Sequence, residues 1–232
     1  MADGSAEQNG LVLWGATTSR TLRAHWALAE LGLDYQSRPI EPRSGETKTA
    51  EYTALTARQK IPLLQDRGLT ITESAAIVAY LSDAYAHDHN RLVPIGAVPR
   101  AKCMEWCFFI ISEIDAASLY VIRRHQDLKH IYGDAPQANL AAAAYLQQQM
   151  RAVDRQLADG RRFLQGERFS AADLLLSTCI TWAGRYGLPL SATAIAYNSG
   201  LTTRQTYRQA LRRNRAASAA TPTATDGAAQ PG

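Results

Sequence analysis

Three hydroxyl side chains follow one another near the start of the chain, at Thr17, Thr18 and Ser19. They close a turn after a short apolar run and stand directly before a helical pattern, so they mark a helix N-terminus. The free N–H groups of such a terminus favour an anion, including a thiolate. A thiol titrates at about pH 8.5, and one charge-assisted hydrogen bond contributes about 1.5–3 kcal/mol. One hydroxyl and the helix end could therefore bring a thiol close to neutrality; the alternative is that the hydroxyls only cap the helix.

A second group of candidate residues lies further along the chain, at Ile61-Pro62 and at Thr72–Ser74. A proline that opens a strand is compatible with a trans bond at a sheet edge or with a cis bond. The segment Thr72–Ser74 begins a helix directly after a strand, with Thr72 as the expected cap. The N–H groups at that start could bind a carboxylate, and a plain helix cap is the alternative.

The elements that position these residues follow from the hydrophobic pattern. Apolar runs and alternation predict four strands, and periods of three and four residues predict helices between them. The order is β-α-β, a loop, then β-β-α: strands at 11–14, 35–40, 61–64 and 69–71, helices at 19–31 and 72–84, and a loop at 41–48.

The second half of the chain reads as helical throughout. A Pro- and Gly-containing segment, 86–98, is the expected linker between a first domain at 11–85 and an all-helical domain at 99–215. Helices are expected at 101–127, 137–157, from 170 onward and at 202–213. Residues 1–10 and 216–232 lack a periodic pattern and are predicted to be disordered. The fold class is therefore α+β.

Composition argues against several functional classes. The net charge is +4, but Lys and Arg are spread along the chain, which does not favour nucleic-acid binding. No apolar run approaches the roughly 20 residues of a membrane span, and residues 1–10 do not have the order of a signal peptide. Cys103, Cys107 and Cys179 are expected to be buried, reduced thiols of a cytoplasmic protein. His125 and His130 do not complete a zinc spacing with them, so no metal is expected.

Taken together, these motifs resemble the cytosolic glutathione transferase family, in its bacterial-like, serine-type form. The matching stretches fall in the order of that family and cover nearly all of the chain between its two ends: Leu13–Gly15, Thr18–Arg23, Trp26–Gly32, Lys60–Leu64, Thr72–Ile77, Tyr80–Leu81 and Glu167–Asp173.

The resemblance implies a fold and a set of binding residues. It implies an N-terminal thioredoxin-like domain with a mixed four-stranded sheet, an all-α helical bundle after it, and a homodimer. Pro62 would be a cis-proline, and the backbone of Ile61 would pair with the cysteinyl part of glutathione. Glu73 and Ser74 would hold the γ-glutamyl end and Lys60 the glycyl end. Ser170 and Asp173 would form a buried capping motif that serves folding.

The catalytic hydroxyl is implied less directly. Serine-type members carry a Ser one helical turn before an Arg, which Ser19 and Arg23 match, with Thr18 and Thr17 as competitors. The first strand and turn hold neither Tyr nor Cys, which disfavours the tyrosine and cysteine types. One stretch departs from the family, which usually has Asn-Pro and a Gly where this chain has residues 56–59.

The second substrate needs an apolar wall beside the sulfur. The best candidates lie on one face of the first long helix: Ile114, Ala117, Tyr120 and Val121. The adjoining basic run Arg123–His125 could meet an anionic substrate, but basic runs on helices are usually solvated, so we favour solvent or interdomain contacts here. Trp106 and Phe108–Ile110 are expected in packing or a dimer surface.

The predicted activity is that of a glutathione transferase. Such an enzyme would activate the glutathione thiol for conjugation to, or reduction of, a hydrophobic electrophile. The alternative is a protein of the same fold that binds glutathione or another partner without catalysis, since fold alone does not fix function.

Overall fold

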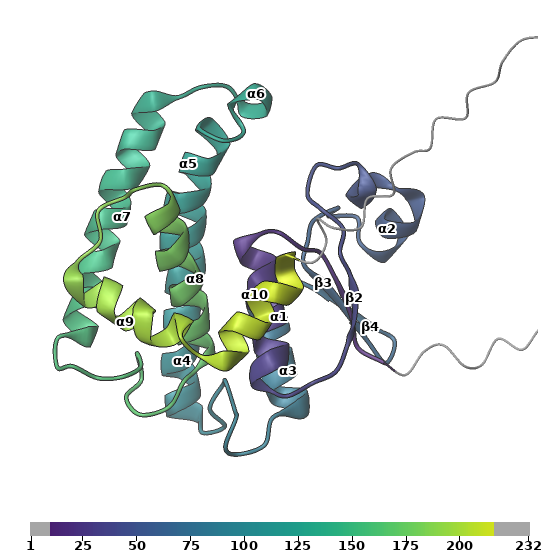
Figure 1. Ribbon diagram of the computed structural model, residues 1–232, viewed down its shortest axis with the longest axis horizontal. Coiled ribbons are helices and arrows are strands. Elements are labelled where there is room, and N and C mark those ends of the chain that lie inside the picture. The colour runs from purple at the N-terminus through teal and green to yellow at the C-terminus, as the bar shows by residue number, and fades with distance from the viewer. Residues whose placement is uncertain (1–9, 216–232) are drawn as a thin grey trace, which may run out of the picture.

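The computed structural model describes residues 10–215. The predicted disordered ends therefore lie outside the described residues, apart from Gly10. A sheet with its helices forms one side of the molecule and a bundle of long helices the other (Figure 1). This is the predicted α+β architecture, a thioredoxin-like domain followed by an all-helical domain.

The sheet has four short strands in the order β2-β1-β3-β4. β1 (Val12–Trp14) pairs in parallel with β2 (Gln36–Arg38) and antiparallel with β3 (Leu63–Asp66). β4 (Leu69–Thr72) returns antiparallel to β3. The parallel pair needs a crossover, which α1 (Ser19–Glu30) supplies. All four strands fall within or beside the predicted segments.

Two details of the first domain differ from the prediction. The loop predicted at 41–48 ends in a 3₁₀ turn, Glu46–Lys48, and an unpredicted helix α2 (Ala50–Leu55) follows it, anchored by the buried Tyr52. Thr72 does not cap α3 (Ser74–Tyr85), because it is still paired in β4. Glu73 occupies the cap position instead, without a capping bond from its side chain.

The helical domain begins with one long column. The helix predicted at 101–127 is built from α4 (Ala97–Phe109), a π-helical stretch η2 (Ile110–Leu119) and α5 (Tyr120–His125). The next helices are α6 (Lys129–Tyr132), α7 (Pro136–Leu157) and α8 (Ala171–Arg185).

Two helices complete the described chain. The helix predicted at 202–213 corresponds to α10 (Gln205–Arg215), and α9 (Ala192–Thr202) was not expected. α9 buries only Ala194 and Leu201, so its sequence carries little amphipathic pattern. In Figure 1, α10 lies beside α1, between the sheet and the bundle.

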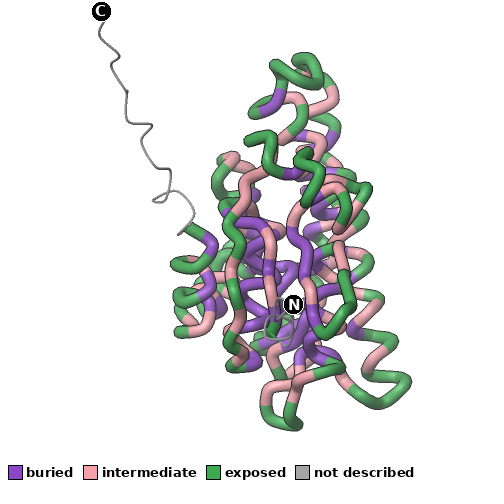
Figure 2. The backbone as a smooth tube through the Cα atoms, turned by 90° about the vertical axis from the view of Figure 1, so that its right-hand side faces the viewer, coloured by how far each residue is buried: buried purple, intermediate pink, exposed green. Residues whose placement is uncertain are grey.

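One core of buried side chains includes residues of both halves. Figure 2 shows the buried stretches of the chain gathered in the middle of the molecule. Trp26 of α1 is fully buried against the rings of Phe169 and Tyr207, which belong to the helical domain. The start of α8 matches the predicted capping motif, since the buried Asp173 carboxylate accepts hydrogen bonds from the Ser170 N–H and hydroxyl. Such packing makes relative movement of the halves costly.

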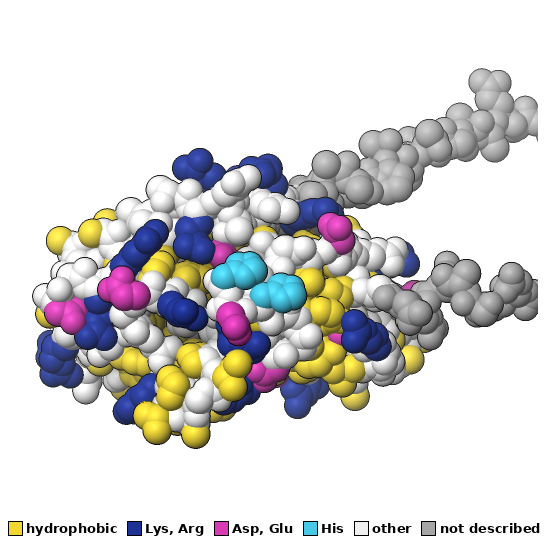
Figure 3. All heavy atoms as spheres, turned by 90° about the horizontal axis from the view of Figure 1, so that it is seen from below, with side chains coloured by type: hydrophobic (Ala, Val, Ile, Leu, Met, Phe, Trp, Pro, Cys, Tyr) yellow, Lys and Arg dark blue, Asp and Glu magenta, His cyan; other side chains and the backbone are white. Residues whose placement is uncertain are grey.

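On the face shown in Figure 3, Lys and Arg side chains are spread among acidic and hydrophobic ones. Within residues 10–215, no helix is both long and apolar enough to cross a bilayer. The three cysteines are free and buried, and burial raises the pKa of Cys179 to about 12.

Candidate functional site

A cleft of about 550 Å³ runs between the two domains. Ligand sites typically enclose about 300–1,000 Å³, so a small molecule fits it. The sheet side contributes the start of α1 and the loops before α2 and β3, and the helical side contributes α5 and α6. Its lining residues are Thr18, Arg20, Pro42, Arg43, Gly45, Thr47, Lys48, Gln59, Lys60, Ile61, Tyr120, Arg123, Ile131 and Tyr132.

The two predicted groups on the sheet side meet because of a close backbone approach. Gly15, in the turn after β1, has φ +113°, and a Cβ at this position would lie 2.7 Å from the Cβ of Ile61. Only glycine fits such a contact and such a φ. The Ile61–Pro62 bond is cis, as the resemblance implied, and the Tyr52 hydroxyl donates to the Lys60 carbonyl at 2.8 Å.

The three hydroxyls at the start of α1 share a hollow against α5 and α8, but only Thr18 also lines the cleft. Thr18 lines the cleft and caps α1, accepting from the Thr21 N–H at 3.0 Å. Ser19 is not among the residues that line the cleft. Its Oγ accepts from Nη2 of Arg185 at 2.6 Å, in a neighbouring hollow between α1 and α8. Thr17 takes a positive φ of 64° in the turn.

Asn214, near the end of α10, holds this turn at several points. The Thr17 N–H donates to its backbone carbonyl at 2.9 Å. Its side-chain oxygen accepts from the Thr21 hydroxyl at 2.6 Å, and its amide nitrogen donates to the Thr18 carbonyl at 3.2 Å. Asn214 is buried, so these bonds exchange little with water. Sequence reasoning missed this residue, because its partner Thr21 is 193 positions away.

Arg23 does not reach the cleft. It is fully buried, donates to the Thr178 hydroxyl at 2.8 Å, and pairs with Asp115 of η2 at 2.8 Å. Arg20 binds the same carboxylate. Burial opposes ionisation of Asp115, but the two arginines outweigh it and lower the pKa of the carboxyl. These contacts join α1 to the helical domain.

The start of α3 has a strained backbone, and its residues Glu73 and Ser74 lie outside the lining of the cleft. Glu73 has φ +69°, an uncommon conformation for a residue with a side chain. Its exposed carboxylate lies 3.2 Å from Nη1 of Arg58. Ser74 is buried, with its Oγ 3.4 Å from Nη1 of Arg23. Neither Glu73 nor Ser74 lines the cleft, so their predicted role stays a prediction.

The loop that departs from the family pattern keeps a glycine-like shape. Gln59 stands at the position where the family usually has Gly, and its φ is +51°. Its side-chain amide donates to the Thr53 hydroxyl at 3.0 Å, which fixes the loop. Lys60 and Ile61 follow it in the cleft wall. The backbone at Gln59 is therefore in the left-handed region that favours glycine.

The comparisons with known proteins agree with this arrangement. Residues 9–83 match the model of the glutathione S-transferase N-terminal domain. These residues are a glutathione S-transferase N-terminal domain. The chain is 26% identical over 191 residues to glutathione S-transferase GstA from Escherichia coli O157:H7, covering 81% of this chain and 89% of that protein. It is 28% identical to a probable maleylacetoacetate isomerase 1 of Drosophila melanogaster, covering 77% of this chain and 70% of that one.

A solved structure extends the likeness to the helical domain. The glutathione transferase URE2P6 from Phanerochaete chrysosporium, in complex with oxidized glutathione, superposes with a TM-score of 0.78. The match covers 90% of this chain and 98% of that one at 20% identity, which shows a shared fold. The glutathione S-transferase N-terminal domain therefore stands beside the same kind of helical domain.

The helical wall beside the glutathione S-transferase N-terminal domain differs in part from the prediction. Tyr120 lines the cleft as expected. Ile114 is packed in the core with 1% exposure, so its side chain does not face the cleft. Ala117 and Val121 are not among the lining residues either. Ile114 lies on the side of η2 that packs against α7 and α8, whereas Ala117 is exposed, so the predicted face is divided between core and surface.

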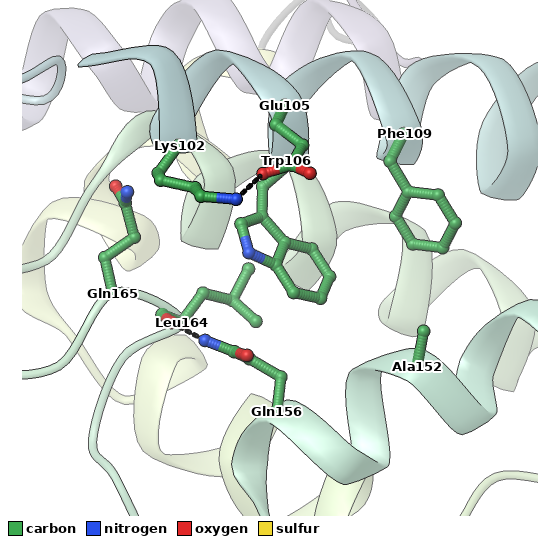
Figure 4. Close-up of a pocket in the computed structure, with 8 residues that line it drawn as sticks. All are labelled: Lys102, Glu105, Trp106, Phe109, Ala152, Gln156, Leu164 and Gln165. Atoms are coloured by element: carbon green, nitrogen blue, oxygen red, sulfur yellow. Dashed lines mark hydrogen bonds and ion pairs between the residues drawn. The ribbon is translucent and has the colours of Figure 1, made fainter. Parts of the chain in front are cut away.

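A second cavity of about 580 Å³ lies away from the glutathione S-transferase N-terminal domain, between α4 and α7. Trp106 and Phe109 project from α4 toward Ala152 and Gln156 of α7 (Figure 4). Lys102 pairs with Glu105 at its edge. It shares no lining residue with the interdomain cleft.

Proposed function

We propose that this protein is a glutathione transferase, which activates the thiol of glutathione and conjugates it to, or uses it to reduce, a hydrophobic electrophile. The single observation that carries the proposal is the interdomain cleft. It combines the capped start of α1, the Lys60-Ile61 edge beside a cis-proline, and a wall from the helical domain. The similarity to proteins named glutathione S-transferase supports the same activity.

Glutathione is bound along the thioredoxin-like side of the cleft. The backbone of Ile61 pairs with the cysteinyl part as an added strand, and Lys60 meets the glycyl carboxylate. Glu73 and Ser74 hold the γ-glutamyl end at the start of α3. The absence of a side-chain cap on α3 supports this role, because its first N–H groups are left for a carboxylate.

Thr18, rather than the Ser19 that the spacing favours, donates to the sulfur. Two observations support Thr18: it lines the cleft beside Ile61, whereas the Ser19 oxygen is bonded to Arg185. The Thr21 hydroxyl donates to Asn214 at 2.6 Å, so in the contact between the Thr18 and Thr21 hydroxyls, at 3.0 Å, Thr18 is the donor, and its proton turns from Thr21 to the sulfur when glutathione binds. The proposed enzyme therefore belongs to the serine-type group, whose members activate the thiol with a side-chain hydroxyl. In this protein a threonine supplies that hydroxyl.

The reaction proceeds by nucleophilic attack. The thiol proton leaves to solvent, and the Thr18 hydroxyl and the start of α1 stabilise the thiolate that remains. The sulfur electron pair forms a C–S bond with the electrophilic carbon. The leaving group departs with the electron pair of the bond that breaks, and the net charge is conserved.

The setting of the enzyme belongs to the same proposal. We infer a cytoplasmic protein, supported by three buried reduced thiols. We infer a homodimer, supported by Val98 and Phe108 on α4, which are 76% and 71% exposed. Gel filtration giving a single 25.4 kDa species would exclude the dimer.

The test has two steps, binding and turnover. The protein is passed over immobilised glutathione and eluted with free glutathione, and conjugation to 1-chloro-2,4-dinitrobenzene is then followed by absorbance. Retention with turnover is the expected result. Retention without turnover across a panel of electrophiles would favour the non-catalytic alternative, and failure to bind glutathione would remove both.

A further inference from the structure

The interdomain cleft is strongly cationic. Its lining includes basic residues from both domains: Arg20, Arg43, Lys48, Lys60 and Arg123. None of the described residues that line it is Asp or Glu. A cleft lined by charges of one sign raises the local concentration of oppositely charged ligands.

Two of these charges already have a partner. Arg20 binds Asp115, and Lys60 stands at the proposed glycyl end of glutathione. Arg43, Lys48 and Arg123 differ, because none of them forms an ion pair with an acidic side chain in residues 10–215. Asp127 lines a neighbouring hollow with Arg123 and its charge acts to raise the pKa of Arg123, but it forms no ion pair with this arginine and accepts a hydrogen bond from the Tyr186 hydroxyl.

Arg43 and Arg123 also act on each other across the cleft. Arg123 is half-buried on α5, and burial together with the charge of Arg43 lowers the pKa of its guanidinium. Arg43 is exposed, so water screens part of this repulsion, and an anion between the two guanidinium groups would relieve the rest.

The phenol of Tyr120 lies among the same charges. Burial opposes ionisation of its phenol, yet the charges of Arg20, Arg124 and Arg43 outweigh burial and lower the pKa of Tyr120. Arg20 lies 4.3 Å from the centroid of the Tyr120 ring, and Arg124 lies 4.9 Å from it. Arg124 also lies 5.2 Å from the centroid of the Tyr132 ring, so the rings of Tyr120 and Tyr132 both lie beside these arginines.

Glutathione does not account for both arginines. Its two carboxylates belong, in the proposed function, to Lys60 and the start of α3, both on the thioredoxin-like domain. Arg123 comes from the opposite wall, on α5 of the helical domain.

We propose that the electrophilic substrate carries a carboxylate, which Arg123 and Arg43 bind while Tyr120 and Tyr132 pack against its unsaturated or aromatic body. This inference rests on the proposed glutathione transferase activity and narrows its substrate class. A guanidinium presents a planar fork of donors that matches a carboxylate, so the pair selects for charge and for orientation. It also replaces the expectation that the basic run at 123–125 makes only solvent or interdomain contacts.

A pair of substrates that differ only at the charged group tests whether the cleft selects for a carboxylate. The pair is 4-chloro-3-nitrobenzoate and its methyl ester, each measured as kcat/KM and divided by its uncatalysed rate with glutathione. The wild-type protein should prefer the acid, and Arg123→Gln should lower the acid-to-ester ratio by about tenfold or more. Arg151→Gln removes an exposed arginine of α7 outside the cleft, and it should keep the wild-type ratio.

Binding of the two reaction products separates the possible failures. The glutathione conjugates of the acid and of the ester are titrated calorimetrically into wild-type and Arg123→Gln protein. Preference for the acid conjugate that the variant loses supports the inference. Equal binding of both conjugates, or an unchanged ratio in Arg123→Gln, would overturn it and leave the proposed function intact. If neither conjugate binds, the proposed function fails and the inference fails with it.

Discussion

The helices α1 and α3 begin in opposite ways. The start of α1 is closed: Thr18 has extended backbone angles, its side chain accepts from the Thr21 N–H, and Thr21 bonds back to the Thr18 N–H. The start of α3 is open: Glu73 stands at the cap with φ +69° and no capping bond from its side chain. A cap typically contributes about 1 kcal/mol, and α3 does without it.

The difference indicates two kinds of anion site. At α1 the capping box satisfies the N–H groups of Thr18 and Thr21, and the capping side chain itself is what a thiolate can meet. At α3 the N–H groups remain for a ligand, and an unusual backbone conformation accompanies them. Strained residues persist where the surroundings over-determine them, and they cluster at binding sites. The closed start therefore fits catalysis, and the open start fits binding.

The largest expected effect is at the closed start. Thr18→Ala should lower kcat by about a hundredfold or more, because it removes the proposed donor to the thiolate. Thr18→Ser should keep most of the activity, and Ser19→Ala should change it far less, since its oxygen serves Arg185. Initial rates with 1-chloro-2,4-dinitrobenzene measure all three variants. A loss in Ser19→Ala equal to that in Thr18→Ala would return the role to Ser19.

A smaller loss is expected from the residue that holds the closed start. Asn214→Ala removes the bonds of its side chain to the Thr21 hydroxyl and the Thr18 carbonyl, and the Thr21 hydroxyl can turn to that carbonyl at 2.9 Å, so the loss of stability should be about 1 kcal/mol. Because the turn then loosens, kcat should fall about tenfold while the KM for glutathione changes far less. Arg212→Ala, an exposed change on the same helix, serves as the matched control for urea unfolding and kinetics. Equal falls in kcat for both variants would contradict a positioning role.

At the open start the expected change is in affinity. Ser74→Ala should raise the Kd for glutathione about tenfold by removing one hydrogen bond to a charged group. The dipeptide cysteinylglycine lacks the γ-glutamyl end, so wild type and variant should bind it equally. Calorimetry with both ligands measures the difference. An equal loss for tripeptide and dipeptide would place the effect elsewhere in the fold.

The sequence foretold the two helix starts because both depend on local signals. Turn residues after apolar strands, followed by a helical period, identified α1 and α3 within a residue or two of their observed starts. The same local patterns located the four strands. Ser170 and Asp173 were found in the same way, since a capping motif spans a single turn.

What the sequence did not reveal depends on contacts between distant segments. Thr18 and Ser19 are neighbours, and on a helix neighbours point in directions about 100° apart, so spacing cannot tell which one faces a cleft. The answer came from Arg185, a residue 166 positions away. Asn214 lies in an Arg-rich stretch that looks like a solvated helix end. Ile114 has the period of a helix face, but the π-helical stretch carries it into the core.

The smallest expected effect tests whether the open start trades stability for binding. A side chain at the backbone angles of Glu73 costs about 1–3 kcal/mol, and glycine there recovers this at an entropic cost of about 0.5–1 kcal/mol. The ion pair with Arg58 is largely exposed and offsets little of the gain. Glu73→Gly should therefore raise the free energy of unfolding by about 1 kcal/mol, which is about 2–4 °C in Tm.

The same change should weaken glutathione binding, because it removes a proposed γ-glutamyl contact. Thermal unfolding and calorimetry on one preparation measure both quantities, with Glu51→Gly on the exposed face of α2 as the control for a glycine in place of glutamate. A variant that is less stable, or more stable with unchanged affinity, would show that the conformation at Glu73 is not kept for the ligand.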